Sequence, residues 1–392
     1  MEKVQADIQH LAQTIGIRPP LSQEEYEAGQ YVLSRLREIG LTDLQEQPFY
    51  SIRRIGERLG FTTLVANFGI LIGAIGSGKS RLLRLLGVTL TLVAHHNLRR
   101  ALMGRAPLGE WFWPQRRSHN IIARLPSQSN QAQARVVLLA HLDTDTARFS
   151  AQPPIRPYSP YLFSSLPALA FAGALLTALN APVWLRRMVS ALMIGQAGLV
   201  MADEIGSASP GANDNASGVA LLLQLAEELT QHPLADTEVV LAFTGCETAG
   251  CNGAAELAAK YGKEWASAWW LVIDSVGAGE LCWVTEHGWA ADFGSRYHSD
   301  PDLMCILEQV AAANPTLGIM GRPLMTVNAV RPLVANGCKA AAVMGYERAG
   351  NTPTQWRQTG DTPAILNPAT QQRAYEFIQA ILAKIDEDTP KK

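Results

Sequence analysis

The apolar positions near the start of the chain repeat with helical spacing. Apolar residues recur every three or four positions between Val4 and Ile15, and Gly16 follows, so the pattern predicts a helix that ends there. Ser22 and Glu25 form a capping box, which predicts the start of a second helix. The chain therefore opens with two amphipathic helices.

Two longer blocks change this pattern because they are apolar on every side. The segments without any Asp, Glu, Lys or Arg are 60–78, 85–98, 157–185 and 188–202. Each pair of segments is separated by a short stretch that contains arginine. The pattern predicts two inserted apolar helical hairpins, at 57–105 and 155–203.

Outside these blocks, short buried-strand patterns alternate with amphipathic helix patterns. The predicted strands and helices are 135–141, 238–243, 269–273 and 340–344 (strands) and 216–229 and 254–261 (helices). Strand–helix alternation favours a mostly parallel sheet covered by helices on both faces. The sequence therefore predicts an α/β fold with three αβα layers and a mostly parallel mixed sheet, assembled from residues 1–56, 106–154 and 204–392.

The composition and charge of the chain exclude several classes of protein. Apolar residues make up 47% of the 392 residues and charged residues only 17%, against about 25% charged in an average soluble domain. A disordered chain is excluded, and the net charge of −2 gives no basic excess for nucleic acid. The odd number of five cysteines does not indicate a disulfide framework. The first residues lack the apolar core of a signal peptide, so the expected compartment is the cytoplasm.

Candidate chemistry gathers at the predicted strand ends. His141 ends one strand and Asp143 follows it, Asp274 ends another, and Glu247 follows a third. Asp214 lies in a polar loop before a helix. The carboxyl ends of parallel strands share one edge of a sheet, and histidine with carboxylates suits zinc. A carboxylate such as that of Asp143 can orient the imidazole that binds the metal.

These segments resemble the zinc aminopeptidase family that includes bacterial leucyl aminopeptidases and glutaminyl cyclases. The matching segments are Gly16–Arg18, Asn120–Ala123, His141–Asp143, Gly211–Gly218, Glu247–Gly253, Asp274 and Asp361–Thr362. The resemblance covers most of the chain outside the two insertions, and the loop 211–218 is its most specific part.

The resemblance implies a role for each residue. His141 and Asp274 would bind one zinc, and Asp214 would be the carboxylate that bridges two zincs in relatives. Glu247 would be the general base that takes a proton from a metal-bound water. Asp143 would contact the metal ligands without binding the metal itself. The implied activity is an aminopeptidase-like hydrolysis of N-terminal peptide bonds, with peptides as substrates.

Two ligands of the family's second zinc are replaced. The family has two consecutive glutamates, base then ligand, and Thr248 stands at the ligand position. It also has a histidine four residues before Asp361, where this chain has Arg357. We therefore expect one zinc, with Arg357 supplying positive charge near Asp214; two zincs remain an alternative. Glutaminyl cyclases keep the opposite ligand pair, so cyclase activity is not predicted.

Two other functions remain open from the residues alone. The first is that of a relative without catalytic activity, which would act as a membrane-associated binding protein. The second is a P-loop nucleotide-binding protein, because Gly73, Gly78, Lys79 and Ser80 satisfy the phosphate-loop spacing inside the first insertion. The alternative for that motif is a basic turn between two apolar helices.

The insertions predict a membrane-associated protein. The candidate membrane helices are 60–77, 83–98, 160–179 and 188–203, and a span needs about 20 apolar residues. Each hairpin returns the chain to its starting side, so the catalytic segments share one compartment. Arginines flank the hairpins at both ends, so the positive-inside rule does not choose an orientation. A soluble helical subdomain or an oligomer interface is the alternative, and the oligomeric state is not predicted.

Overall fold

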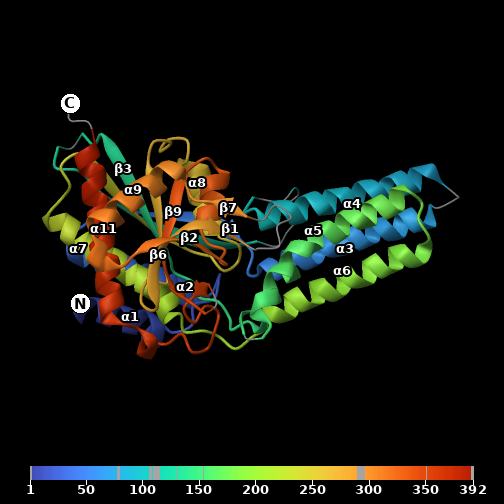
Figure 1. The fold of residues 1–392 in the computed structure, drawn as a ribbon, viewed down its shortest axis with the longest axis horizontal. Helices are drawn as coiled ribbons and strands as arrows, with labels where there is room; N and C mark the ends of the chain where they lie inside the picture. The colour runs from blue at the N-terminus through green and yellow to red at the C-terminus, as the bar shows by residue number, and fades with distance from the viewer. Residues whose placement is uncertain are drawn as a thin grey trace.

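The computed structural model describes the chain except for residues 1, 77–79, 106–107, 109–114, 130, 153, 289–295, 350 and 390–392. It confirms the predicted α/β class. A mixed sheet lies between two helical layers, and a rod of four helices projects from this α/β domain (Figure 1).

The centre of the sheet is parallel and its edges are antiparallel. The strands are β1 Leu44–Ser51, β2 Arg116–Leu125, β3 Ala134–His141, β4 Thr237–Thr244, β5 Trp269–Asp274, β6 Glu280–His287, β7 Tyr297–His298, β8 Met320–Leu324, β9 Lys339–Glu347 and β10 Thr352–Pro353. Their order is β1-β2-β4-β3-β5-β9-β6-β7, with β8 beside β6 and β10 beside β9. The neighbours β4, β3, β5 and β9 run parallel, so their carboxyl ends meet at one edge.

Helices cover both faces of the sheet. One layer contains α1 Glu2–Gln9, α2 Gln23–Ile39, α7 Ser217–Gln231, α9 Pro301–Ala313 and α11 Pro368–Asp388; the other contains α8 Asn252–Tyr261 and α10 Val330–Ala335. Side chains along β3 alternate between the two layers. Val136 and Leu138 pack with the first group of helices, whereas Val137 and Leu139 pack with the second. Strand β3 is therefore buried on both faces, as its continuous apolar run predicts.

The amino-terminal helices form where the sequence predicts them. The side chain of Ser22 accepts a hydrogen bond from the Glu25 amide and caps α2, and Gly40 ends that helix with a left-handed φ of 99°. The carboxylate of Glu25 instead accepts hydrogen bonds from Leu21 and Cys246 amides. Glu25 therefore ties α2 to the loop that precedes Glu247.

The two apolar insertions form the projecting rod. They contain α3 Ile55–Ile75, α4 Arg81–Leu102, α5 Ser159–Ala178 and α6 Val183–Asp203. Helix α4 packs against α3 and α5, helix α6 packs against the same two helices, and α3 also contacts α5. The two hairpins therefore share one core and form one four-helix bundle (Figure 1).

The helices on either side of the phosphate-loop motif do not fit its interpretation as a P-loop. A P-loop follows a strand, but Gly73 lies inside helix α3, and Ser80 caps α4 by accepting a hydrogen bond from the Leu83 amide. Gly78 and Lys79 lie outside the described residues. The expected strand–loop–helix context is therefore wrong, because the apolar run before the motif is a helix that packs in the bundle.

Among the described helices, two are long and apolar enough to cross a bilayer. They are α3 and the segment Arg156–Ala178, which contains α5. Helix α4 ends with Arg99 and Arg100, and Arg187 lies near the start of α6, so these two helices have shorter apolar stretches. Length and composition of this kind also occur in buried helices of soluble proteins.

Candidate metal centre and catalytic site

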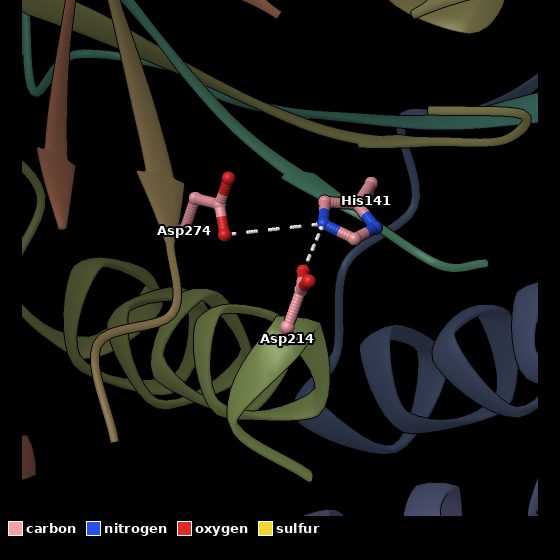
Figure 2. A group of neighbouring side chains, drawn as sticks. All are labelled: His141, Asp214 and Asp274. Atoms are coloured by element: carbon pink, nitrogen blue, oxygen red, sulfur yellow. Dashed lines mark hydrogen bonds and ion pairs between the residues drawn. The ribbon is translucent and has the colours of Figure 1, made fainter. Parts of the chain in front are cut away.

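Three predicted ligands meet at the carboxyl edge of the sheet. His141 ends β3 and Asp274 ends β5, and these two strands are parallel neighbours. Asp214 comes from the turn Ala212–Ala216, which leads into α7. Figure 2 shows the three side chains pointing toward one another. His141 and Asp274 are 133 positions apart in sequence, and the pairing of their strands brings them together.

The spacing of these side chains is that of a small cation site. His141 Nε2 lies 3.0 Å from Asp214 Oδ1 and 4.0 Å from Asp274 Oδ1 (Figure 2). The three candidate ligand atoms all lie within 4.8 Å of one another, and all three residues are buried. One nitrogen and two carboxylate oxygens at this spacing are a donor set that zinc accepts.

The main chain fixes the imidazole ring. His141 Nδ1 lies 3.0 Å from the carbonyl oxygen of Asp143 and 3.8 Å from its carboxylate. In the neutral ring, an Nδ1–H that donates to this carbonyl leaves the Nε2 lone pair available for a metal ion, and in the protonated ring Nε2–H also donates to Asp214. The backbone of Asp143, rather than its carboxylate, therefore makes the short contact to the ring.

The Asp143 carboxylate holds the loop that carries the predicted base. It accepts hydrogen bonds from the Glu247 amide at 2.8 Å and the Thr248 amide at 2.9 Å. The Thr248 hydroxyl donates to the same carboxylate at 2.8 Å. Thr248, at the position of a family ligand, thus uses its hydroxyl to orient the base loop.

Glu247 is buried beside the ligand cluster. Its Oε1 accepts a hydrogen bond from Cys251 Sγ at 3.2 Å, and within the described part of the chain its Oε2 has no hydrogen-bond partner. Burial raises the pKa of Glu247 to about 7, and the charges of Asp274 and Asp143 add to the rise. A carboxyl group with a pKa near neutrality can exchange protons readily, as a general base requires.

Two residues without a predicted role, Asp361 and Arg18, support the Asp214 turn. Asp361 accepts hydrogen bonds from the Asn213 and Asp214 amides at 2.6 and 3.0 Å. The buried Arg18 guanidinium donates to the Leu142 carbonyl at 2.8 Å and the Gly211 carbonyl at 3.1 Å. Arg18 therefore ties the end of β3 to the turn that carries Asp214.

Negative charge is in excess around the ligands. Burial and the charge of Asp214 raise the pKa of Asp274 to about 6 and that of Asp361 to about 7. Burial acts to lower the pKa of His141, but its hydrogen bond to Asp214 and the nearby carboxylates raise it well above its usual value. Buried carboxylates that resist ionisation are stabilised by a bound cation, so the residues present fit a divalent metal.

The opposite side of the site contains arginines. Arg357 Nε lies 2.9 Å from Asp145 Oδ2, and Arg148 Nε lies 3.0 Å from the same oxygen. The positive charge of Arg357 also interacts with Asp214 and Asp274. Arg357 therefore lies in electrostatic range of the ligands, as the sequence hypothesis requires, while its direct ion pair is with Asp145.

This arginine cluster connects the site to the bundle. Arg148 lies 3.4 Å from Glu204, whose carboxylate accepts hydrogen bonds from the Gly56 amide at the start of α3. Although burial acts to raise it, the charges of Arg148 and Arg357 hold the pKa of Asp145 below its usual range. Spacing alone could not have revealed this network, because it joins a strand end, a carboxy-terminal loop and an inserted helix.

A pocket lies beside Glu247. Besides Glu247 and Thr248 it is lined by apolar side chains from the base of the bundle and by three arginines: Ile55, Leu59, Leu102, Phe163, Arg148, Arg331 and Arg357. The insertions therefore supply part of the pocket wall, a role that their apolar composition did not indicate.

Residues 197–312 match the family model described as Peptidase family M28. The match confirms the resemblance to zinc exopeptidases that the sequence motifs predict, and it contains Asp214, Glu247 and Asp274. Together with the ligand cluster it supports a zinc-dependent, exopeptidase-like hydrolase. No match was found among curated proteins.

Solved structures share this fold at low sequence identity. A glutaminyl cyclase from Bacteroides thetaiotaomicron is 13% identical, with a TM-score of 0.59 and 97% of each chain covered. BSAP, a zinc aminopeptidase from Bacillus subtilis, is 14% identical, with a TM-score of 0.57, 98% of this chain and 94% of that chain covered. A zinc-dependent exopeptidase from Parabacteroides distasonis is 12% identical, with a TM-score of 0.54, 99% of this chain and 97% of that chain covered. These similarities concern the fold.

Proposed function

We propose that this protein is a one-zinc exopeptidase that releases N-terminal residues from peptides. The observation that carries the proposal is the convergence of His141, Asp214 and Asp274 beside Glu247, whose buried Oε2 is unsatisfied within the described residues. Ligands and a base at one sheet edge are the minimum that hydrolysis of a peptide bond needs at a metal site.

The three ligands would hold the metal, and the surrounding residues would position the reaction. Bound zinc would polarise the scissile carbonyl and make water a better nucleophile. Glu247 Oε2 would accept the proton of the attacking water and return it to the leaving amine. The Asp143 carboxylate would keep Glu247 in place through its amide hydrogen bond.

Arg357 would take over the electrostatic role of the second metal ion. It supplies a permanent positive charge that interacts with Asp214 and Asp274. Thr248 offers no carboxylate, and its hydroxyl is used by Asp143. We therefore expect a metal content of about one per chain.

Metal analysis of the purified chain, after incubation with zinc and removal of excess, tests this proposal. We expect about one zinc per chain, lost in His141→Ala and kept in His232→Ala, which changes an exposed histidine. Thr248→Glu with Arg357→His should raise the content to about two, because it restores both ligand types. About two zincs in the unchanged chain would contradict the one-metal proposal.

Peptide hydrolysis is measured on the same preparations. Peptides with a free apolar N-terminus should be shortened by one residue, whereas a peptide with N-terminal glutamine should show hydrolysis without cyclisation. Bound zinc without any hydrolysis would instead favour the alternative of a binding protein that has lost catalysis.

We also propose that this activity belongs to a membrane-associated protein, with peptides as substrates and lipid as a partner. The two helices long and apolar enough to cross a bilayer support this location. Both hairpins begin and end at the α/β domain, so the whole site lies in one compartment.

A further inference from the structure

The outward face of α3 is apolar along its whole exposed length. After Glu57 in the first turn, the exposed residues at helical spacing are Phe61, Leu64, Phe68, Leu71 and Ile75. Phe68, near the middle, is 58% exposed and Leu64 is 60% exposed. A helix of a soluble protein presents polar residues on this face.

The inward face of α3 combines small residues with the larger Leu59 and Ile70. Its buried positions include Gly60, Ala66, Gly69 and Gly73. A Cβ atom at Gly69 would lie 2.7 Å from the Gly87 carbonyl oxygen, and one at Gly87 would lie 2.5 Å from the Gly73 nitrogen. The backbones of α3 and α4 therefore touch where glycine alone fits, a contact that is typical of helices packed within a membrane.

The other three helices also expose large apolar side chains. Exposed apolar side chains on α4 include Leu85, Leu86 and Leu92. Exposed apolar side chains on α5 and α6 include Phe171, Leu175, Leu192 and Leu199. Within α4, Thr91 Oγ1 lies 3.3 Å from the Ala66 carbonyl of α3, so a polar side chain faces inward while leucines face outward.

Charged residues are confined to the two ends of the bundle. In the described parts of the four helices, the exposed charged residues are Glu57, Arg81, Arg99 and Arg187, all within two turns of a helix end. The 21 residues of α3 extend about 30 Å, which equals the thickness of a bilayer's hydrocarbon core. The length of α3 therefore matches a bilayer, whereas the uncharged runs of α4 and α6 are shorter.

The distribution of this surface identifies its partner. The helices pack in the cyclic order α3, α4, α5, α6, and all four expose apolar side chains. A second copy of the chain would cover one side of the bundle and leave the others in water. Lipid surrounds a bundle on every side.

Building on the membrane association proposed above, we infer that helices α3 to α6 form a bundle embedded in the hydrocarbon core of a lipid bilayer, with large apolar side chains facing outward on all four helices. The pocket beside Glu247 then lies at the bilayer surface, because Ile55, Leu59 and Phe163 line it from the base of the bundle.

Spin labelling in vesicles of phosphatidylcholine and phosphatidylglycerol tests this inference. In a Cys305→Ser background, which removes the exposed cysteine of the described residues, a label is placed at Phe68→Cys. Tyr50→Cys, exposed on β1, is the control in the α/β domain. We expect oxygen, which concentrates in hydrocarbon, to relax the label at 68, and a water-soluble nickel chelate to relax the label at 50.

Two results would overturn the inference. A label at 68 that the nickel chelate reaches would mean that the bundle lies in water or that the protein only touches the membrane. A label at 68 shielded from both reagents, with a dimeric mass, would mean that a second copy covers it.

A flotation assay gives an independent readout. Leu64→Lys with Phe68→Lys should reduce the vesicle-bound fraction at least about tenfold, because lysine at the centre of a span is costly. Tyr50→Lys with Met320→Lys, at exposed apolar positions of the α/β domain, should leave binding unchanged. Equal binding of both double variants would contradict insertion. Neither readout uses hydrolysis, so a negative result leaves the exopeptidase proposal standing.

Discussion

The two sides of the site balance charge in different ways. On the side of His141, two carboxylates lie within 4.0 Å of the imidazole, and the raised pKa of Asp274 reflects negative charge that a bound cation would neutralise. On the side of Arg357, the carboxylate of Asp145 already contacts two guanidinium groups. A metal ion and a pair of arginines can both neutralise buried carboxylates, but only the metal ion can also bind a substrate atom as a ligand.

The largest expected effect comes from Glu247→Gln, which removes the proposed base and keeps the side chain's size. Hydrolysis should fall by about 10²- to 10⁴-fold while bound zinc is retained. Steady-state rates with a peptide substrate, together with metal analysis, check this expectation. The exposed Glu308→Gln serves as the control, and activity that survives in Glu247→Gln would remove Glu247 from the mechanism.

Asp145→Asn breaks the arginine side of the site. Arg148 and Arg357 are then left buried without their shared carboxylate, and the free energy of unfolding should fall by about 3–5 kcal/mol. Denaturant unfolding measures the change. Asp388→Asn, in an exposed pair with Lys384, should change stability by about 0.5 kcal/mol or less. Equal effects of the two substitutions would mean that the buried network contributes little.

Asp143→Asn tests the connection between the two sides. The amide can accept hydrogen bonds through one oxygen, whereas the carboxylate uses both oxygens for the Glu247 and Thr248 amides. We expect kcat to fall about 10- to 100-fold because the base is displaced. Zinc content should remain unchanged, since His141 is held by the backbone carbonyl; loss of zinc would give the Asp143 carboxylate a direct part in metal binding.

Thr248→Val should have the smallest effect. It removes one hydroxyl hydrogen bond and keeps the amide bond to Asp143. A loss of about 1 kcal/mol, or several-fold in kcat/KM, is expected, with metal content unchanged. If Thr248→Val lost zinc, Thr248 would be a ligand and the two sides of the site would not be divided as described.

Much of the α/β fold could be predicted from local patterns. The run that ends at His141 and the run that ends at Asp274 are short, apolar and bounded by polar residues, and both are central parallel strands. The Ser22 cap also forms as predicted. These features depend on residues close in sequence, so periodicity and turn chemistry suffice to locate them.

The candidate site was predictable only in part. His141, Asp214 and Asp274 stand at strand ends or in a specific loop, and topology brings them together. Arg148, Asp145 and Glu204 carry no such signal, because the Arg148–Glu204 and Asp145–Arg357 contacts join residues 56 and 212 positions apart in sequence. The buried surface of the bundle could not be predicted either, since apolar composition does not tell which face of a helix carries glycine.

The positions of the two hairpins in the chain determine the order in which the sheet is completed. Strand β3 is synthesised between the hairpins, while both of its sheet neighbours, β4 and β5, follow helix α6 in the sequence. During translation the first half of the protein therefore emerges with its most central strand unpaired and both hairpins already made. Asp214, Glu247 and Asp274 emerge later still, after both hairpins have been synthesised.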